Sequence, residues 1–342
     1  MKQKRILIVR TDRLGDTVMI TPIARELKKT FPGCFVATLT QPTTSEVMMN
    51  NPNIDLIIND NLEKETFWDV TREIRKHKFT HGLLVLPTER AAYQMFFGRV
   101  RKRIMTGIKP YGIITLFSSV SREKYIHLKH EADYCMDLAR KIGVSTENIQ
   151  PEIFVTEEEK SEALELLESK GITPEDFKIF LHTGSKLSSP NWSEDKYFRL
   201  IKGILERFSL IKFKIILTAN EMTPGFLGKI NSLNDSRIIN INKDIDSHLR
   251  KLISAISLAD LMICSSTGPI HLADALNIRC LGIHCHRSMN CVKHWGVINK
   301  KSINLEVPAD YCDSNCSADK NECHFENGIT VEDVLNNIQI KR

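Results

Sequence analysis

The chain has 342 residues, of which 42% are hydrophobic and 26% charged, and its formal net charge is +5. This balance excludes a disordered or low-complexity chain, and at roughly 100–200 residues per domain the length favours two domains. The modest positive charge does not call for nucleic acid, and it suits an anionic substrate or a phosphate-rich membrane surface.

The N-terminus carries no targeting signal that we recognise. Its apolar run, residues 6–9, is too short for the core of a signal peptide and is followed at once by polar residues. No segment approaches the roughly 18 apolar residues of a membrane-spanning helix. We therefore expect a cytoplasmic protein, with peripheral contact at the inner face of the cytoplasmic membrane as an open alternative.

Short apolar runs in the first half predict buried strands separated by helices. Ile20, Ile23, Ala24 and Leu27 follow the i, i+3, i+4, i+7 spacing of one helix face. The predicted strands are residues 6–9, 35–40, 55–58 and 82–86, and further helices are predicted over 68–77 and 127–142.

The second half repeats this alternation. Thr156 and Glu159 form a capping-box pattern that begins a helix. The predicted strands are residues 179–181, 213–218, 238–241, 261–264 and 280–283. Helices are predicted over 195–208, 247–256, from Pro269 onward and over 330–340.

Alternating strands and helices predict parallel sheets covered by helices, so the fold class is α/β. Two such series predict two Rossmann-like domains, residues 1–160 and 161–325. Ligands of such sheets bind beyond the carboxyl ends of the strands, which for two domains predicts a central cleft.

Residues 10–17 form a polar loop between the first strand and the first helix. Gly15 permits a tight turn or a close backbone approach. Asp16 falls near the start of the helix, where it is either a structural N-cap or a general base for an acceptor hydroxyl.

Two further loops each follow a strand. Residues 182–192 are rich in hydroxyl groups and carry Lys186, so they are either an ordinary polar loop or a phosphate site. Residues 265–273 lead into a helix with Pro269 near its start, and such a helix start is a natural diphosphate site. His271 lies one turn further, where a structural histidine is the alternative.

Together, residues 10–22 (RTDRLGDTVMITP), 182–192 and 266–276 (STGPIHLADAL) resemble glycosyltransferase family 9, the ADP-heptose:lipopolysaccharide heptosyltransferases. The resemblance covers most of the chain. It includes residues 51–55 (NPNID) and the ending from Cys312 to Val334.

The resemblance implies a GT-B fold and an inverting transfer that needs no metal or other cofactor. It implies that Asp16 is the general base. Donor-binding residues would then be Gly184, Ser185, Lys186, Ser266, Thr267, Gly268 and His271. The last helix, in residues 326–342, would be able to cross back to the N-terminal domain.

Two positions depart from the family pattern. Pro190 stands where a lysine is common, and Ser266 stands where an aspartate is common before Thr-Gly. The lost aspartate would bind donor sugar hydroxyls, so the donor is ADP-heptose or another nucleotide sugar. A protein acceptor, or a catalytically silent glycan- or nucleotide-binding module, remains an alternative.

The acceptor is expected to be a lipid-linked glycan of the lipopolysaccharide inner core. We assign Arg13 and Gly15 of the first loop to its binding. Arg101 and Arg103, in a basic run after Phe96 and Phe97, are either further acceptor contacts or a solvated charged edge.

Cysteines gather toward the C-terminus. The chain has nine, and Cys312, Cys316 and Cys323 follow one another closely, with Cys291 as a candidate fourth thiolate. In a cytosolic protein such a group favours reduced thiols or a structural zinc or iron site over disulfides.

Overall fold

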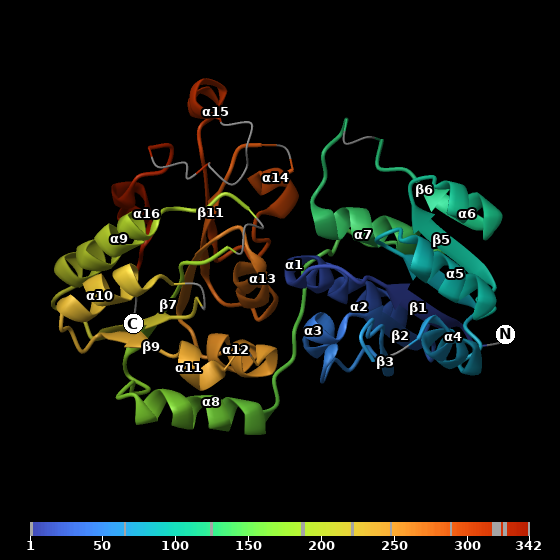
Figure 1. The fold of residues 1–342 in the computed structure, drawn as a ribbon, viewed down its shortest axis with the longest axis horizontal. Helices are drawn as coiled ribbons and strands as arrows, with labels where there is room; N and C mark the ends of the chain where they lie inside the picture. Colours follow the sequence, from blue (N-terminus) through green and yellow to red (C-terminus); the bar gives the residue numbers. More distant parts are fainter. Residues whose placement is uncertain are drawn as a thin grey trace. The chain divides into compact units, whose positions relative to one another are not determined.

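The computed structural model describes residues 3–64, 66–123, 126–185, 189–219, 222–246, 248–287, 289–316, 323 and 327–340. The chain divides into two compact units, Met1–Phe154 and Val155–Arg342 (Figure 1). The boundary lies six residues before the expected end of the first domain at residue 160, because the helix that begins after Thr156 packs within the second unit.

The first unit contains a six-stranded parallel sheet in the order β3-β2-β1-β4-β5-β6. The chain moves outward from β1 in one direction and then returns to place β4 on its other side, so the topological switch point lies between β1 and β4. The strands are β1 (Arg5–Val9), β2 (Phe35–Thr40), β3 (Leu56–Asn59), β4 (His81–Leu84), β5 (Lys102–Thr106) and β6 (Phe117–Val120).

Helices cover both faces of this sheet (Figure 1). One face packs on α4, α5 and α6 through Ile74, Met95 and Tyr111, and α2 packs with α7. The helices are α1 (Leu14–Val18), α2 (Thr21–Thr30), α3 (Pro42–Ser45), the 3-10 turn η1 (Glu46–Met48), α4 (Phe67–Lys76), α5 (Glu89–Phe97), α6 (Pro110–Ile114) and α7 (Glu131–Arg140).

The second unit repeats the topology. Its sheet has the order β12-β11-β10-β7-β8-β9, all parallel, with the switch point between β7 and β10. The strands are β7 (Phe177–His182), β8 (Phe213–Leu217), β9 (Ile238–Asn240), β10 (Leu261–Ser265), β11 (Cys280–His284) and β12 (Ile303–Glu306).

Its helices again form two layers (Figure 1). One contains α9, α10 and α16, and α8 packs with α12. The helices are α8 (Glu157–Ser169), α9 (Glu194–Arg207), α10 (Pro224–Ser232), α11 (Asn242–Ile245), α12 (Leu249–Ile256), α13 (Gly268–Ala275), α14 (Val292–Trp295), α15 (Ala309–Asn315) and α16 (Val331–Asn337).

The last helix differs from its expected path. We expected residues 326–342 to be able to cross back to the N-terminal domain, but α16 packs on α9 of the second unit. Leu335 of α16 lies against Gly203, and Arg207 donates hydrogen bonds to Glu332 at 2.5 Å and Asn336 at 2.9 Å. Burial of its apolar face on α9 is the physical reason for this position.

The α/β class and the two Rossmann-like domains are confirmed. Three strands were not predicted: β5 and the edge strand β6 of the first sheet, and the edge strand β12 of the second. Their sequences are partly exposed and carry polar residues, so they lack the apolar run of a central strand. No helix among the described residues is long and apolar enough to cross a bilayer.

Candidate functional site

The loop after β1 begins at a buried arginine and ends in a short helix. Arg10 continues β1 through a hydrogen bond from its backbone N–H to the carbonyl of Leu39 at 3.0 Å. The N-cap of α1 is Arg13, so Asp16 is the third helical residue and the N-cap interpretation is wrong. Gly15 lies inside α1 and is not in the left-handed region, so it does not form the expected turn.

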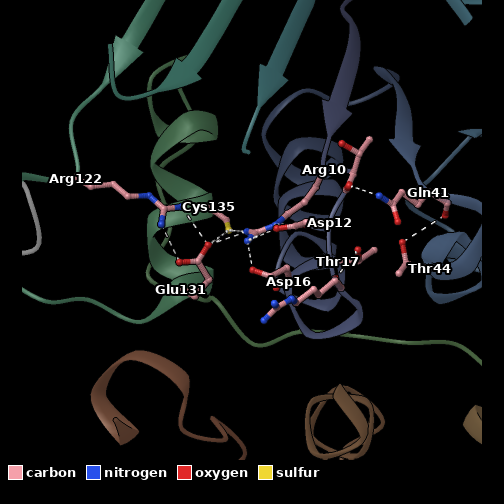
Figure 2. A network of polar contacts seen from close by, with 11 residues as sticks. Arg10, Asp12, Asp16, Thr17, Gln41, Thr44, Arg122, Glu131 and Cys135 are labelled. Atoms are coloured by element: carbon pink, nitrogen blue, oxygen red, sulfur yellow. Dashed lines mark hydrogen bonds and ion pairs between the residues drawn. The ribbon is translucent and has the colours of Figure 1, made fainter. Parts of the chain in front are cut away.

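Arg10 joins three carboxylates (Figure 2). Its Nε lies 3.0 Å from Oδ1 of Asp12, and its Nη1 lies 2.8 Å from Oε1 of Glu131. Its Nη2 forms an ion pair with Asp16, and Nη1 also donates to Sγ of Cys135 at 3.0 Å. The side chain of Arg10 is 4% exposed and that of Asp16 is 19% exposed, so the arginine is enclosed while the carboxylate reaches solvent.

A second arginine completes the network from the other side. Arg122 donates to both carboxylate oxygens of Glu131, at 3.0 and 3.1 Å. Three carboxylates, those of Asp12, Asp16 and Glu131, thus share two enclosed guanidinium groups. Burial disfavours the ionised form of a carboxyl group and favours its protonated form.

The proton binds most readily at Asp16. Burial raises its pKa from 3.8 to about 6, aided by the neighbouring charges of Asp12 and Glu131 and opposed by Arg10 and Arg13. Burial acts in the same direction on Glu131, but Arg10 and Arg122 outweigh it and hold the pKa of Glu131 below its usual value. Two carboxyl groups of one network therefore have pKa values shifted in opposite directions, which is typical of acid–base sites.

The two predicted donor loops leave neighbouring strands. Because β7 and β10 pair in parallel with His182 opposite Cys264, residues 183–185 and 265–268 emerge at the same edge of the sheet, at its switch point. Gly184 and Ser185 therefore follow the same end of the sheet as Thr267 and Gly268, and their joint role in donor binding stays a prediction. Lys186 lies outside the described residues.

Side chains behind the first donor loop fix its backbone. Asn191 donates to the carbonyl of Thr183 at 2.7 Å and accepts from the hydroxyl of Tyr197 at 2.7 Å. Trp192 is buried and meets Tyr197 edge to face at 5.6 Å. The backbone of the loop is therefore fixed to α9 through Asn191 and Tyr197.

The second donor loop presents the start of α13. Thr267 is the N-cap but makes no side-chain capping bond, and its Oγ1 lies 3.0 Å from Sγ of Cys264. Pro269 occupies the second helical position, one later than expected. The backbone N–H of Ser266 bonds to the carbonyl of Ile283 at 3.1 Å. A helix start of this kind favours an anion.

The side chain of His271 is buried and is not accessible to solvent. It is 2% exposed, and its ring lies 5.5 Å from that of Trp295. One turn further, the buried carboxylate of Asp274 accepts the backbone N–H groups of Ile298 and Asn299 at 3.0 and 2.8 Å. These contacts support the loop that packs beside α13.

Arg101 directly precedes β5, and Arg103 is the second residue of that strand. The register places Lys102 beside His81, and His81 beside Ile6, near the amino end of β1. Asp16 follows the carboxyl end of β1, so the structure does not bring these arginines to it. Arg103 is held in place by the carbonyl of Thr115 at 2.8 Å and stacks on Phe96 and Phe117.

The C-terminal cysteines have a neighbour that the sequence did not single out. Cys285 lies near Cys312, Cys316 and Cys323, and burial raises the pKa of its thiol to about 11. Nε of Arg287 donates to Cys316 at 2.7 Å. Among the described residues, no three His, Cys, Asp or Glu side chains are arranged to hold a metal ion, and the expected set with Cys291 is not brought together.

Sequence reasoning missed most of the charge network. Arg10 and Asp12 lie in the motif that was singled out, but no role was assigned to them. Glu131 and Arg122 lie more than 100 residues further along the chain, in segments without a motif. Helical periodicity placed Glu131 on a helix, but nothing in the pattern showed which side chain it would contact.

Comparisons with known proteins identify the family and the fold. A family model described as glycosyltransferase family 9 (heptosyltransferase) matches residues 68–324. A Haemophilus influenzae protein named provisionally as a glycosyltransferase is 27% identical over 308 residues, 86% of each chain.

Solved structures share the fold over nearly the whole chain. The glycosyl transferase family 9 structure from Veillonella parvula has a TM-score of 0.79 at 20% identity, covering 97% of this chain and 95% of its own. The E. coli ADP-heptose lipopolysaccharide heptosyltransferase II has a TM-score of 0.76 at 14% identity, covering 97% and 96%.

Proposed function

The chain belongs to glycosyltransferase family 9 and is a glycosyltransferase, and from this premise we propose that it transfers heptose from ADP-heptose to a lipopolysaccharide inner-core acceptor. The observation that carries the mechanism is Asp16, a partly exposed carboxylate beyond the carboxyl end of β1 whose pKa is about 6.

Asp16 is proposed as the general base. Near neutral pH it is mostly ionised, yet it is more basic than an ordinary aspartate, which is the compromise that acid–base catalysis favours. It removes the proton of the acceptor hydroxyl while that oxygen forms a bond to the anomeric carbon. The bond from this carbon to the diphosphate oxygen breaks, its electron pair leaves with ADP, and a single displacement inverts the anomeric configuration.

The donor diphosphate is proposed to bind on the second unit, at the neighbouring loops 183–185 and 265–268. Backbone N–H groups at the start of α13 and the hydroxyl of Thr267 are directed donors for the charge that grows on the leaving group. The family resemblance implies a transfer that needs no metal, and we propose a metal-independent transfer.

The donor sugar is the least constrained part of this proposal. The E. coli relative is by name an ADP-heptose enzyme, but Ser266 cannot accept hydrogen bonds from sugar hydroxyls as strongly as a carboxylate does. A purified enzyme should therefore be assayed with ADP-heptose, UDP-sugars and GDP-sugars and a truncated lipopolysaccharide core. Selective transfer from ADP-heptose supports the proposal, transfer from another donor changes the substrate, and no binding of any donor would indicate a silent module.

Arg13 and Gly15 remain the proposed acceptor contacts, because both lie in α1 or at its N-cap next to Asp16. Arg13 is exposed and its charge acts on Asp16. An acidic inner-core sugar or phosphate would pair with this guanidinium.

A different surface of the first unit is proposed to contact the membrane. Residues 99–116 contain five basic residues and no Asp or Glu. Within them Ile108, Ile113, Ile114 and Leu116 are 65–75% exposed on and around α6. Arg101, exposed at the amino edge of β5, belongs to this surface rather than to the site of Asp16. Aliphatic side chains among cations are typical of peripheral binding to anionic lipids.

Vesicle sedimentation tests this contact. The paired substitution Ile113→Ser and Ile114→Ser should reduce binding to phosphatidylglycerol vesicles several-fold, whereas Leu210→Ser, at a fully exposed leucine of the second unit, should not. Equal binding of both variants, or equal binding of the wild type to purely zwitterionic vesicles, would argue against the proposed surface.

A further inference from the structure

Glu131 is a buried carboxylate that belongs to none of the recognised loops. It is the first residue of α7, is 2% exposed, and lies 121 positions from Arg10 in the chain. Oε1 accepts Nη1 of Arg10 at 2.8 Å, and both oxygens accept Arg122. Burying an ionised carboxylate is costly unless it is paired, so Glu131 and the two arginines form one structural unit.

The guanidinium of Arg10 has a fixed orientation within this unit (Figure 2). Asp12 accepts from Nε at 3.0 Å and from Nη2 at 3.3 Å, Glu131 accepts from Nη1, and Nη2 also pairs with Asp16. Because a guanidinium is a rigid planar fork, two of its edges determine where the third points. Glu131 is therefore the partner that turns Arg10 toward Asp16 from α7.

We infer that Glu131 is a positioning residue for Asp16 that acts through Arg10, and that Arg122 opposes its charge. This inference rests on the proposed role of Asp16 as the base. Glu131 does not touch the reacting atoms. It holds the guanidinium of Arg10, which orients Asp16, and its negative charge raises the pKa of Asp16.

The charges that face Asp16 fix the sign of each expected effect. They are those of Arg10, Asp12, Glu131 and Arg13. The nearby thiol of Cys135 contributes no charge near neutral pH, because burial raises its pKa well above the usual range. Removing the negative charge of Glu131 lowers the pKa of Asp16, whereas removing the positive charge of Arg122 raises it.

The titration of Asp16 can be followed without any assay of transfer. Protein labelled with carboxyl-13C aspartate is titrated by NMR, and the Asp16 resonance is identified by its absence in Asp16→Asn. We expect a midpoint near pH 6 in the wild type, a midpoint lower by about one pH unit in Glu131→Gln, and a higher midpoint in Arg122→Gln.

Asp133→Asn is the matched control. Asp133 lies in the same first turn of α7 but pairs with Arg140 at 2.6 Å, outside the network. Its substitution should leave the Asp16 midpoint within about 0.3 pH units, since a partly exposed charge that is paired with another arginine is screened. Midpoints of Glu131→Gln and Arg122→Gln that both stay this close to the wild type would overturn the inference.

Activity measurements separate this inference from the proposed function. In Glu131→Gln the acidic limb of the kcat/KM profile should move to lower pH with the NMR midpoint, and kcat should fall while the donor KM is unchanged. If the NMR midpoints move as expected but Asp16→Asn still transfers, the base assignment fails and the positioning of Asp16 stands. If Glu131→Gln does not fold, the direction of the Arg122→Gln shift decides, and the absence of a rise contradicts the inference.

Discussion

The two units share one strand order, yet the loops at their switch points differ in charge: one is lined by ionisable side chains and the other by uncharged ones. Beyond β1, Arg10 and Arg122 meet three carboxylates, and one of these, Asp16, takes up a proton near pH 6. Beyond β7 and β10, residues 183–185 and 265–268 are Thr, Ser and Gly, with no charged side chain. The fold therefore provides two equivalent positions, and the residues there make one suited to proton transfer and the other to an anion.

Loss of the base should give the largest effect. Asp16→Asn keeps the shape of the side chain and its contact with Arg10 but cannot accept the proton, so transfer should slow by about 10²–10⁴-fold. Binding of ADP, measured by calorimetry, should be unchanged because the proposed donor site lies on the other unit. Asp12→Asn, which also removes a partner of Arg10, is the control and should retain far more activity.

Stability should depend on Arg10 more than on an exposed arginine of the same unit. Arg10→Met leaves buried carboxylates without their shared cation, and we expect a loss of about 3–5 kcal/mol in the free energy of unfolding. Arg72→Met removes an exposed pair with Asp69 at 3.3 Å and should cost no more than about 1 kcal/mol. Equal losses in urea unfolding would contradict the picture of an enclosed network.

Ionised Asp16 should lower the free energy of unfolding at high pH. Folding raises the pKa of Asp16 from 3.8 to about 6, so the ionised carboxylate destabilises the folded protein fully above about pH 6. This penalty declines as the pH falls from 6 and is gone below 3.8, where folded and unfolded chains are both protonated. Asp16→Asn should therefore be more stable than the wild type at pH 8, by up to about 3 kcal/mol, and should lose this advantage by pH 4. A constant difference across this range in thermal melts would count against the shifted pKa.

A substitution at the uncharged switch point of the second unit should have the smallest effect. Thr267→Val keeps the shape of the N-cap residue but removes its hydroxyl, so we expect about tenfold weaker ADP binding, or about 1.4 kcal/mol. The unfolding free energy of the variant should be nearly that of the wild type. Unchanged ADP affinity would place the diphosphate away from α13.

Much of this comparison could be predicted from the sequence, because central strands and loops carry local signals. Apolar runs marked β1, β2, β7 and β10, and the polar loops after them held the candidate residues. Strand β5 and the edge strands β6 and β12 gave no such signal. Helix 127–142 was predicted too long at its start, because His130 is the N-cap that begins α7 at Glu131.

The charge network was not predictable by the same means. The proximity of Arg10 and Glu131 is a property of the sheet order, which places α7 and the β1 loop at one edge, and no short pattern encodes it. Likewise, Arg101 and Arg103 were grouped with Asp16 because they are basic. The parallel register instead places them toward the amino ends of the strands, whereas Asp16 follows the carboxyl end of β1. Residue type predicted chemistry, but only the register showed which groups act together.

The most direct test of Asp16 as the base is the pH dependence of kcat/KM for transfer from ADP-heptose to a truncated core acceptor. This ratio reports the essential groups of the free enzyme. A rise through a pKa near 6 to a plateau at neutral pH, absent from the residual activity of Asp16→Asn, is the expected result. A profile that is flat from pH 5 to pH 8, or that is unchanged in Asp16→Asn, would contradict the role of this carboxylate.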